Sequence, residues 1–475
     1  MNRHFSAALA ELYKERFGYC PENVTELPAG GSHRIYYRLS GRGLQPAVGV
    51  AGTDVAENRA FIYLAERLKA ASVCVPELYA VSDDSLFYLQ EDLGDVQLFG
   101  ELNKPDGRNW VAEAVSELPR LQTAPGIDWT KPFLQKSFCL RQALWDLNYF
   151  KYCFLKGAGV EFDEDRLEDD FLRFAGVLTE YPDSLSGLMY RDCQSRNVMI
   201  HNGRCYWIDF QGARPGCVLY DLASFLWQAK ARFSPEFRRE MTNLYLAELG
   251  RLREFDTQEA RRLLGGFVFF RTLQVLGAYG FRGLTEHKAH FITSIPAALS
   301  NLAALLDRGA ARDYPELERC CRALCSGRYA MEPEASDALC VEVISFSFKK
   351  GYPEDLSGNG GGFMFDCRAL HNPGRYDEYK PLTGRDEPVI RFLEERGETQ
   401  PFLRHAWELT DPAVERYLSR GFTHLQIGFG CTGGRHRSVY SAERTAAHLR
   451  EKFGGKVAVR LVHREHGIEE FFPAD

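Results

Sequence analysis

Residues 190–210 read YRDCQSRNVMIHNGRCYWIDF, and this stretch decides how the rest of the chain is interpreted. A polar loop holds Asp192 and Asn197 five residues apart. Two apolar runs follow, joined by Asn202-Gly203, a dipeptide that is typical of a tight β-hairpin turn. The second run ends at Asp209, so the sequence predicts a hairpin that returns a second carboxylate to the loop.

These side chains supply the groups that phosphoryl transfer needs. One carboxylate must orient and deprotonate the attacking hydroxyl, and oxygen ligands must hold Mg²⁺ on the nucleotide phosphates. We therefore predict Asp192 as the catalytic base and Asn197 and Asp209 as the metal ligands. A hairpin with solvated polar turns is the structural alternative, but the string I-D-F-Q-G-A at residues 208–213 makes the whole pattern specific.

The pattern resembles the aminoglycoside phosphotransferase and choline kinase superfamily, which has the eukaryotic-like kinase fold, over about residues 1–310. The strings R-D-C-Q-S-R-N, I-D-F-Q-G-A-R and Y-D-L-A, which begin at residues 191, 208 and 220, are similar to one branch of it. That branch phosphorylates the anomeric hydroxyl of N-acetylmuramate or N-acetylglucosamine during cell-wall recycling. The resemblance implies an amino-sugar kinase that uses ATP and Mg²⁺. The supporting residues that we expect are Gln194, Arg196, Arg214 and Asp221. Asp221 could alternatively serve only as the N-cap of a helix.

The nucleotide-binding residues implied by the same resemblance are Gly30, Gly31, Ser32, Arg34, Glu91 and Leu93. The first four precede an apolar run at 35–39 and resemble the family's loop over the ATP phosphates, where glycines let backbone amides approach. The other two lie in residues 89–95, which resemble the family's connection between the two lobes, beside the adenine. A plain hairpin turn and an acidic surface turn are the alternatives for the two segments.

One family feature is missing from the sequence. The kinase fold places a lysine on its third strand to hold the nucleotide phosphates. The equivalent residues 45–50 contain none, and Lys14 and Lys69 are the only lysines among the first hundred residues. Either Arg34 or Arg38 substitutes, or phosphate binding is weaker. An inactive pseudokinase is a further alternative, although the intact set of acidic and amide groups favours activity.

A second site is predicted near the C-terminus, where residues 426–438 read QIGFGCTGGRHRS. A strand, a glycine turn and a helix start make backbone amides and the helix dipole converge on one point, which favours an anion. The residues assigned to this site are Cys431, Thr432, Gly433, Gly434, Arg435, His436, Arg437 and Ser438. Cys431 and Arg437 also have the C-x5-R spacing of cysteine-dependent phosphatases, in which a thiolate attacks the phosphate.

Residues from about 339 to 470 resemble the C-terminal domain of the RNase adapter RapZ, through GCTGGRHRSVY at 430–440, FDCR at 365–368 and TGRD at 383–386. That domain binds a glucosamine phosphate and, in the full adapter, RNA and a ribonuclease. The resemblance implies that Thr432, Gly433, His436 and Arg437 line a sugar-phosphate pocket, with Asp366 nearby. The family's histidine after Asn-Pro is replaced by Gly374, and the adapter's N-terminal P-loop motif does not occur in the chain.

Composition and length frame these sites. The chain has 475 residues, with 58 Lys+Arg against 65 Asp+Glu, so it needs more than one core. Its thirteen cysteines are scattered without a C-x-x-C pair, which favours a reducing cytoplasm over a zinc site or a disulfide framework. No apolar run approaches the roughly 20 residues that span a bilayer, so we expect no membrane partner. Residues 338–475 hold 19 Lys+Arg and 20 Asp+Glu, which makes RNA a weak expectation.

We therefore predict an α+β bilobal kinase-like fold, with an antiparallel-sheet lobe and a mostly helical lobe, followed by a small α/β domain. The expected boundaries are 1–95 and 96–310 for the two lobes, 311–338 for a linker and 339–475 for the RapZ-like domain. The predicted function is an amino-sugar kinase whose C-terminal domain binds a sugar-phosphate effector. A non-catalytic adapter that binds RNA or protein, a kinase/cysteine-phosphatase fusion and a homo-oligomer stay open.

Overall fold

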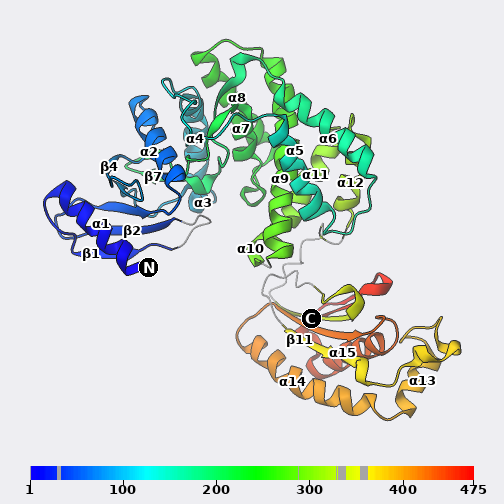
Figure 1. Ribbon diagram of the computed structural model, residues 1–475. Helices are drawn as coiled ribbons and strands as arrows, with labels where there is room; N and C mark the ends of the chain where they lie inside the picture. Colours follow the sequence, from blue (N-terminus) through cyan, green and yellow to red (C-terminus); the bar gives the residue numbers. More distant parts are fainter. Residues whose placement is uncertain are drawn as a thin grey trace. The chain divides into compact units, whose positions relative to one another are not determined.

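The computed structural model describes residues 2–28, 34–286, 288–327, 329, 338–353 and 362–474. The chain divides into two compact units, drawn in Figure 1. The first unit comprises Met1–Ala278 and Pro296–Ala330, and the second comprises Tyr279–Ile295 and Met331–Asp475. The segment Tyr279–Ile295 therefore groups with the second unit, whereas the sequence analysis placed it in the helical lobe of the kinase.

The first unit begins with an antiparallel five-stranded sheet in the order β1-β2-β3-β5-β4. Its strands are β1 (Asn23–Glu26), β2 (Ile35–Ser40), β3 (Ala47–Ala51), β4 (Leu78–Val81) and β5 (Phe87–Glu91). Helix α1 (Asn2–Phe17) packs Leu9 and Tyr13 on the sheet. Helix α2 (Val55–Ala70) starts at the N-cap Asp54, whose carboxylate accepts from the amide of Glu57. The predicted antiparallel-sheet lobe is confirmed.

The second lobe of this unit is mostly helical, as predicted. Its long helices are α4 (Gly107–Gln122), α5 (Leu140–Phe150), α6 (Glu164–Thr179), α7 (Leu219–Leu226), α8 (Pro235–Leu252), α9 (Thr257–Tyr279) and α11 (Ile295–Asp307), with the short α3 (Leu98–Glu101). Two small antiparallel ladders cross it, β6 (Ser186–Met189) with β9 (Arg214–Cys217) and β7 (Val198–His201) with β8 (Arg204–Trp207). Asn202 and Gly203 join β7 to β8 with φ of 48° and 72°, so the predicted hairpin is confirmed.

The predicted linker at residues 311–338 is wrong in its first part. Residues Pro315–Cys325 form helix α12, which packs on α6. The carboxylate of Asp170 on α6 accepts hydrogen bonds from the amides of Glu316 and Leu317, at 2.8 and 3.0 Å. Pro315 occupies the first turn of this helix, where the missing N–H costs nothing. The cysteines of this segment are free thiols on the helix, as predicted.

The second unit contains a five-stranded mixed sheet in the order β11-β12-β10-β13-β14. The strands are β10 (Leu339–Ser347), β11 (Gly362–Asp366), β12 (His424–Cys431), β13 (Val457–His463) and β14 (Ile468–Phe472). The first four in this order are parallel, and β14 is antiparallel to β13. The main helices are α13 (Glu387–Glu395), α14 (Thr399–Ser419) and α15 (Arg437–Phe453), and the unit also has the short α10 (Ala289–Ile292). The predicted α/β domain is confirmed, and the helix start predicted after the glycine turn is that of α15.

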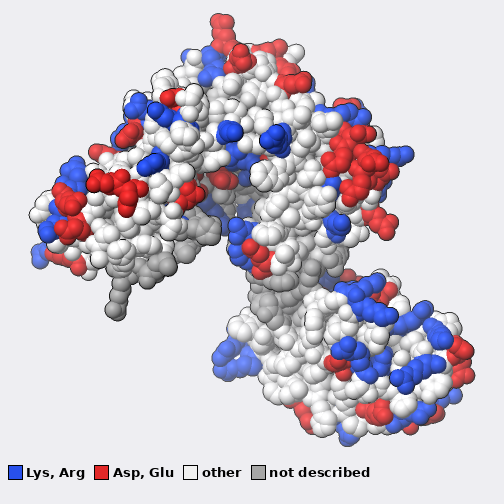
Figure 2. Space-filling view, viewed as in Figure 1, with Lys and Arg blue, Asp and Glu red and all other residues white. Residues whose placement is uncertain are grey.

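One stretch of the described chain is long and apolar enough to cross a membrane, namely Thr257–Thr285, with a mean hydropathy of 1.2. Two-thirds of its apolar window is buried inside the structure, 67%, as in the central helix of a helical lobe. Acidic side chains gather over α6 in the first unit (Figure 2).

Candidate functional site

The loop between β6 and β7 carries Asp192 and is held by Asp221 of α7. The Asp221 carboxylate accepts from the amides of Tyr190 and Arg191, at 2.8 and 3.0 Å, and from the side chain of Gln122, at 2.8 Å. Burial raises the pKa of Asp221 to about 6, although these hydrogen bonds oppose the shift. Asp221 lies within the first turn of α7 and is not its N-cap, which is Val218. The Asp221 side chain thus fixes the backbone of the loop that carries Asp192, the predicted base.

The three predicted chemical groups lie at one place. The Asn197 side-chain nitrogen donates to the Asp192 carbonyl at 2.9 Å and lies 3.5 Å from a carboxylate oxygen of Asp209. The Asn197 amide oxygen is therefore the atom left to bind a cation together with Asp209. Asp192 is exposed, and no hydrogen bond to its carboxylate comes from the described part of the chain. Asp209 has a φ of 64° and Arg191 a φ of 81°, a left-handed conformation that clusters at functional sites.

Arg34, which directly precedes β2, pairs with two of the carboxylates near the site. Its Nη2 is 2.9 Å from Oδ1 of Asp209 and 3.5 Å from Oε1 of Glu57 on α2, and its side chain is 2% exposed. Arg38 instead pairs with Asp92 and Asp95 at 2.7 and 2.9 Å, away from the metal carboxylate. Of the two arginines that the sequence offered, only Arg34 therefore reaches the site.

Gln211 completes this cluster. Its side-chain nitrogen donates to Asp209 at 2.9 Å and to Glu57 at 3.2 Å. Burial raises the pKa of Asp209, and the nearby Asp192 adds to that effect, while the contacts from Gln211 and Arg34 counteract it. The sequence analysis missed Glu57 and Gln211. The kinase resemblance could have identified Glu57, because in that fold the helix after the third strand carries a glutamate that pairs with the phosphate-binding cation.

The remaining predicted residues of this unit lie around the cluster. Arg214 donates to Gln142 of α5 at 3.0 Å, and the neighbouring Arg191 pairs with Asp146 of α5 at 2.6 Å. Arg196 lies over the ring of Phe99, 4.6 Å from its centre. Within the described residues, the Gln194 side chain has no hydrogen-bond partner. The adjacent Ser195 donates to the Gln228 side chain through both its amide and its hydroxyl, a contact that was not predicted from the sequence.

The predicted nucleotide residues are only partly within the described chain. Gly30, Gly31 and Ser32 lie outside the described residues. Leu93 is buried, and a carboxylate oxygen of Glu91 accepts from the amide of Glu77 at 3.1 Å.

In the second unit, the predicted anion loop joins β12, which ends at Cys431, to α15, which begins at Arg437. The Cys431 sulfur lies 3.1 Å from the Ser438 hydroxyl, and the cysteine is 3% exposed. Burial opposes ionisation, but the Ser438 hydroxyl and amide, the Arg435 amide and the charge of Arg437 together lower the pKa of the thiol. Gly434 has a φ of 66°, and a Cβ there would lie 2.9 Å from the Ser347 amide nitrogen, so only glycine fits.

Not all the predicted cations face the loop. Arg437 is 4% exposed, and its Nη1 donates to the carbonyls of Arg368 and Leu370 at 2.9 and 2.8 Å. His436 contacts the Tyr379 carbonyl at 2.9 Å, and burial lowers its pKa, which favours the neutral ring. Asp366 pairs with Arg368 at 2.7 Å. Arg435 also donates to a backbone carbonyl, that of Pro381 at 3.1 Å. All three basic residues therefore contact the backbone around the loop, and of the three Arg435 is the one that lines the cavity beside it.

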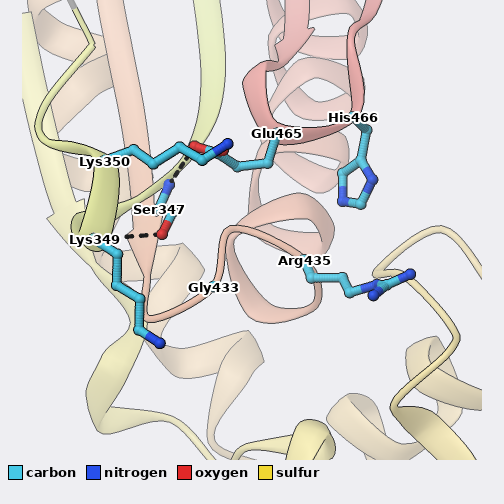
Figure 3. Close-up of a pocket in the computed structure, with 7 residues that line it drawn as sticks. All are labelled: Ser347, Lys349, Lys350, Gly433, Arg435, Glu465 and His466. Atoms are coloured by element: carbon cyan, nitrogen blue, oxygen red, sulfur yellow. Dashed lines mark hydrogen bonds and ion pairs between the residues drawn. The ribbon is translucent and has the colours of Figure 1, made fainter.

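A cavity of about 380 Å³ opens beside this loop, and Figure 3 shows the side chains around it. Its lining residues are Ser347, Lys349, Lys350, Gly433, Arg435, Glu465 and His466. Lys350 pairs with Glu465 at 2.8 Å, and the Glu465 carboxylate accepts from the Ser347 amide at 3.1 Å. Figure 2 shows further Lys and Arg side chains on the visible face of this unit.

Two of the residues predicted for the anion site, Gly433 and Arg435, line the cavity. The other residues that line it were not predicted from the sequence. The signal was available in the sequence, because these residues follow β10 and β13. The carboxyl ends of neighbouring parallel strands meet at one edge of a sheet, where α/β proteins bind their ligands. Within the described residues, no group of three or more Cys, His, Asp and Glu side chains could hold a metal ion.

The two-lobed fold of the first unit, with its Asp-Asn-Asp arrangement and an arginine-glutamate pair, is that of a kinase-like phosphotransferase. Residues 23–255 match the model of the phosphotransferase enzyme family, and residues 339–467 match that of the RapZ C-terminal domain. The chain thus joins a phosphotransferase-family domain to a RapZ C-terminal domain.

Relatives match only parts of this arrangement. A nucleotide-binding protein of Paramagnetospirillum magneticum is 38% identical over 142 residues, which cover 30% of this chain and 43% of that protein. One of Xanthomonas axonopodis pv. citri is 40% identical over 129 residues, 27% of this chain and 43% of that protein. The chain spans less than half the length of these relatives.

Solved structures are similar to the first part of the chain at low identity. The choline kinase LicA of Streptococcus pneumoniae is 12% identical with a TM-score of 0.45, covering 63% of this chain and 99% of that one. A putative aminoglycoside phosphotransferase of Ralstonia eutropha is 14% identical with a TM-score of 0.44, covering 68% and 98%.

Proposed function

We propose that the first unit is an ATP-dependent kinase that phosphorylates the anomeric hydroxyl of an amino sugar, N-acetylmuramate or N-acetylglucosamine. The observation that carries the proposal is the convergence of Asp192, Asn197 and Asp209 with Arg34, which bridges Asp209 to Glu57 at 2.9 and 3.5 Å. The amide oxygen of Asn197 and the carboxylate of Asp209 are hard oxygen donors of the kind that Mg²⁺ prefers. Mg²⁺ bound there would offset the negative charge of the nucleotide phosphates.

The side chains divide the work of the reaction. Asp192 accepts the hydroxyl proton while the sugar oxygen forms a bond to the γ-phosphorus and the bond from that phosphorus to the ADP oxygen breaks. Arg34 places a buried positive charge beside the phosphates, in the role of the absent lysine. Asp221 keeps the loop in register through two backbone amides, so Asp192 stays oriented toward the hydroxyl.

Two observations support a sugar as the acceptor. The strings R-D-C-Q-S-R-N and I-D-F-Q-G-A-R resemble those of anomeric amino-sugar kinases. Near Asp192, α5 contributes Gln142 and Asp146, which pair with Arg214 of β9 and with Arg191 of the loop. Such groups suit a ligand that is rich in hydroxyl and amide groups. The thirteen free cysteines support a reducing, cytoplasmic setting.

We further propose that the second unit binds a phosphorylated amino sugar and reports its level to the kinase. The cavity beside the loop supports this, because Lys349, Arg435 and His466 surround it and Gly433 leaves the backbone accessible. The phosphatase alternative is less favoured, since Cys431 is 3% exposed and the Arg437 guanidinium is bound to two carbonyls. The adapter alternative predicts RNA or protein binding without any sugar phosphorylation.

The decisive experiment is a ³¹P NMR screen of amino sugars with Mg-ATP and the full chain. We expect a new anomeric phosphate signal with wild type, and its loss in Asp192→Asn. A 6-phosphate product would overturn the regiochemistry, and no product with any amino sugar would overturn the kinase proposal. Titration of the full chain with glucosamine 6-phosphate tests the second unit, and an absence of binding would refute the sensing role.

A further inference from the structure

A second large cavity lies in the helical lobe of the first unit, outside the cluster around Asp192. It has a volume of about 710 Å³, which is within the range of small-molecule sites. Its walls come from α6, α8 and α9, from Trp227 at the end of α7, and from the residues between α11 and α12. None of the residues assigned above to phosphoryl transfer lines it.

The lining is strongly basic. It holds five arginines and a single carboxylate, Asp313; the arginines are Arg238, Arg239, Arg261, Arg262 and Arg308. Only Arg262 has a carboxylate partner among the described contacts, Glu259 at 2.6 Å. Guanidinium groups bind phosphate through paired N–H donors, so a surplus of them in one cavity points to a phosphate-bearing ligand.

Arg238 is the half-buried centre of this group. It donates to the Leu226 carbonyl and to the Asn301 side chain, both at 3.1 Å, and lies over the Trp227 ring, 5.3 Å from its centre. None of these partners carries a negative charge. Burial and the like charge of Arg308 lower the pKa of Arg238 to about 10, and an anion in the cavity would relieve both effects.

The helix α9 shows a second sign of a ligand. Gly265 and Gly266 lie in the middle of this helix, where each glycine destabilises by about 0.5–1 kcal/mol relative to alanine. Neither has a positive φ that would require glycine. A Cβ at Gly265 would meet nothing within 4 Å, and both glycines line the cavity. A Cβ at Gly266 would lie 3.2 Å from Leu178, so packing accounts for that glycine, whereas Gly265 leaves its part of the cavity wall without a side chain. Trp227 and Tyr314 also line the cavity, and their rings can lie against an organic group.

We propose that this cavity binds a small organic phosphate that carries two or more negative charges and a ring, such as a nucleoside diphosphate. The arginines hold the phosphates, and the aromatic side chains pack against the ring. A cavity of about 710 Å³ has the size of a small-molecule site, which favours this ligand over an extended acidic peptide.

The cavity is connected to the catalytic loop through α7. Trp227 lines the cavity, and the next residue, Gln228, accepts from the amide and hydroxyl of Ser195 at 3.0 and 2.8 Å. Arg238 also binds the Leu226 carbonyl at the end of the same helix. Occupancy of the cavity therefore acts on the loop that carries Asp192. This regulatory part rests on the proposed kinase function, whereas the binding itself does not.

The test is calorimetric titration of the full chain with uridine diphosphate and with pyrophosphate, in buffer without Mg²⁺. We expect both to bind, uridine diphosphate more tightly because of its ring. Arg308→Gln removes an exposed lining charge and should weaken binding by about tenfold or more. Gly265→Leu should abolish it by filling the cavity.

Matched variants locate the binding site. Arg251→Gln changes an exposed arginine of α8 that lies outside the cavity, and should leave the affinity unchanged. Asp192→Asn should also leave the affinity unchanged, even if the variant no longer phosphorylates a sugar. The binding measurement therefore tests the cavity separately from the proposed kinase activity. If neither uridine diphosphate nor pyrophosphate binds at millimolar concentration, the inference is overturned. Equal affinities in wild type, Arg308→Gln and Gly265→Leu, all with wild-type thermal unfolding, would also overturn it.

Discussion

Replacing Arg34 by methionine is the sharpest test of how the first unit binds a nucleotide. The change keeps an unbranched apolar stem and removes the guanidinium that lies 2.9 Å from Asp209 and 3.5 Å from Glu57. A hydrogen bond to a charged group contributes about 1.5–3 kcal/mol, and the longer contact contributes less. The loss of both contacts, and of the charge that faces the phosphates, should cost about 3–4 kcal/mol of transition-state stabilisation. That corresponds to a fall of roughly 10²–10³-fold in kcat/KM for ATP.

The same change should alter the pH dependence. Arg34 helps to hold down the pKa of Asp209, which burial raises. Without Arg34 that pKa rises further, so the acid limb of the activity profile should move to higher pH. The stability effect has the matching sign. A carboxyl whose folded-state pKa lies above its unfolded value favours the folded state at low pH and loses this contribution as the pH rises. The Arg34→Met protein should therefore be least stable relative to wild type near neutral pH.

Initial rates with varied ATP, together with urea unfolding at acid and neutral pH, measure both effects. Arg34→Lys keeps the charge and should recover at least part of the lost kcat/KM. Arg59→Met is the matched control, because Arg59 is an exposed residue of the same α2 that carries Glu57. The reasoning is refuted if Arg34→Met retains wild-type kcat/KM for ATP, or if Arg59→Met loses as much.

Three further outcomes follow from the described contacts. The pKa of Asp221 is raised from 3.8 to about 6, so protonation of this carboxyl favours the folded state below pH 4, and this contribution is lost as the pH rises through 6. The contribution to the free energy of unfolding is about 3 kcal/mol. Urea unfolding of Asp221→Asn should therefore depend less on pH between 4 and 7 than that of wild type. Arg435→Met should weaken binding of glucosamine 6-phosphate about tenfold by calorimetry and leave the effector-free kinase rate unchanged. Cys431→Ser should bind glucosamine 6-phosphate as wild type does, and wild type should release no phosphate from sugar phosphates in a colorimetric assay. If wild type does release phosphate and Cys431→Ser does not, the second unit is a phosphatase instead.

Local sequence signals predicted the elements well because the forces behind them are local. Asn202-Gly203 determines a hairpin through its own backbone preferences, and the glycine turn before Arg437 marks the start of a helix. The partners of Asp209 were harder to predict. Arg34 precedes it by 175 residues, and their meeting depends on how two lobes pack. The contact of Gln211 with Asp209 is local, but its second contact, with Glu57, also joins residues far apart in the chain.

Side-chain direction was the other property that the pattern did not reveal. Arg435, His436 and Arg437 are adjacent, and a cluster of basic residues suggests a basic surface. The helix that begins at Arg437 directs that guanidinium onto the carbonyls of Arg368 and Leu370, whereas Arg435 stays in the turn and reaches the cavity. Arg435 also donates to a backbone carbonyl, that of Pro381, so the two arginines differ in whether they line the cavity and not in whether they contact the backbone. The difference arises because the chain passes from a turn into a helix between them.

The cost of the Asp209 cluster bears on whether the first unit is an enzyme. Burying the Arg34 guanidinium at 2% exposure requires compensation, and apolar residues of similar size usually stabilise a protein at least as well as a buried ion pair. Left-handed backbone at Arg191 and Asp209 adds about 1–3 kcal/mol of strain for each residue. A domain that only held a scaffold in place would be more stable without these features. Their joint presence beside an exposed Asp192 favours catalysis, since an active kinase needs this arrangement of charges and a pseudokinase does not.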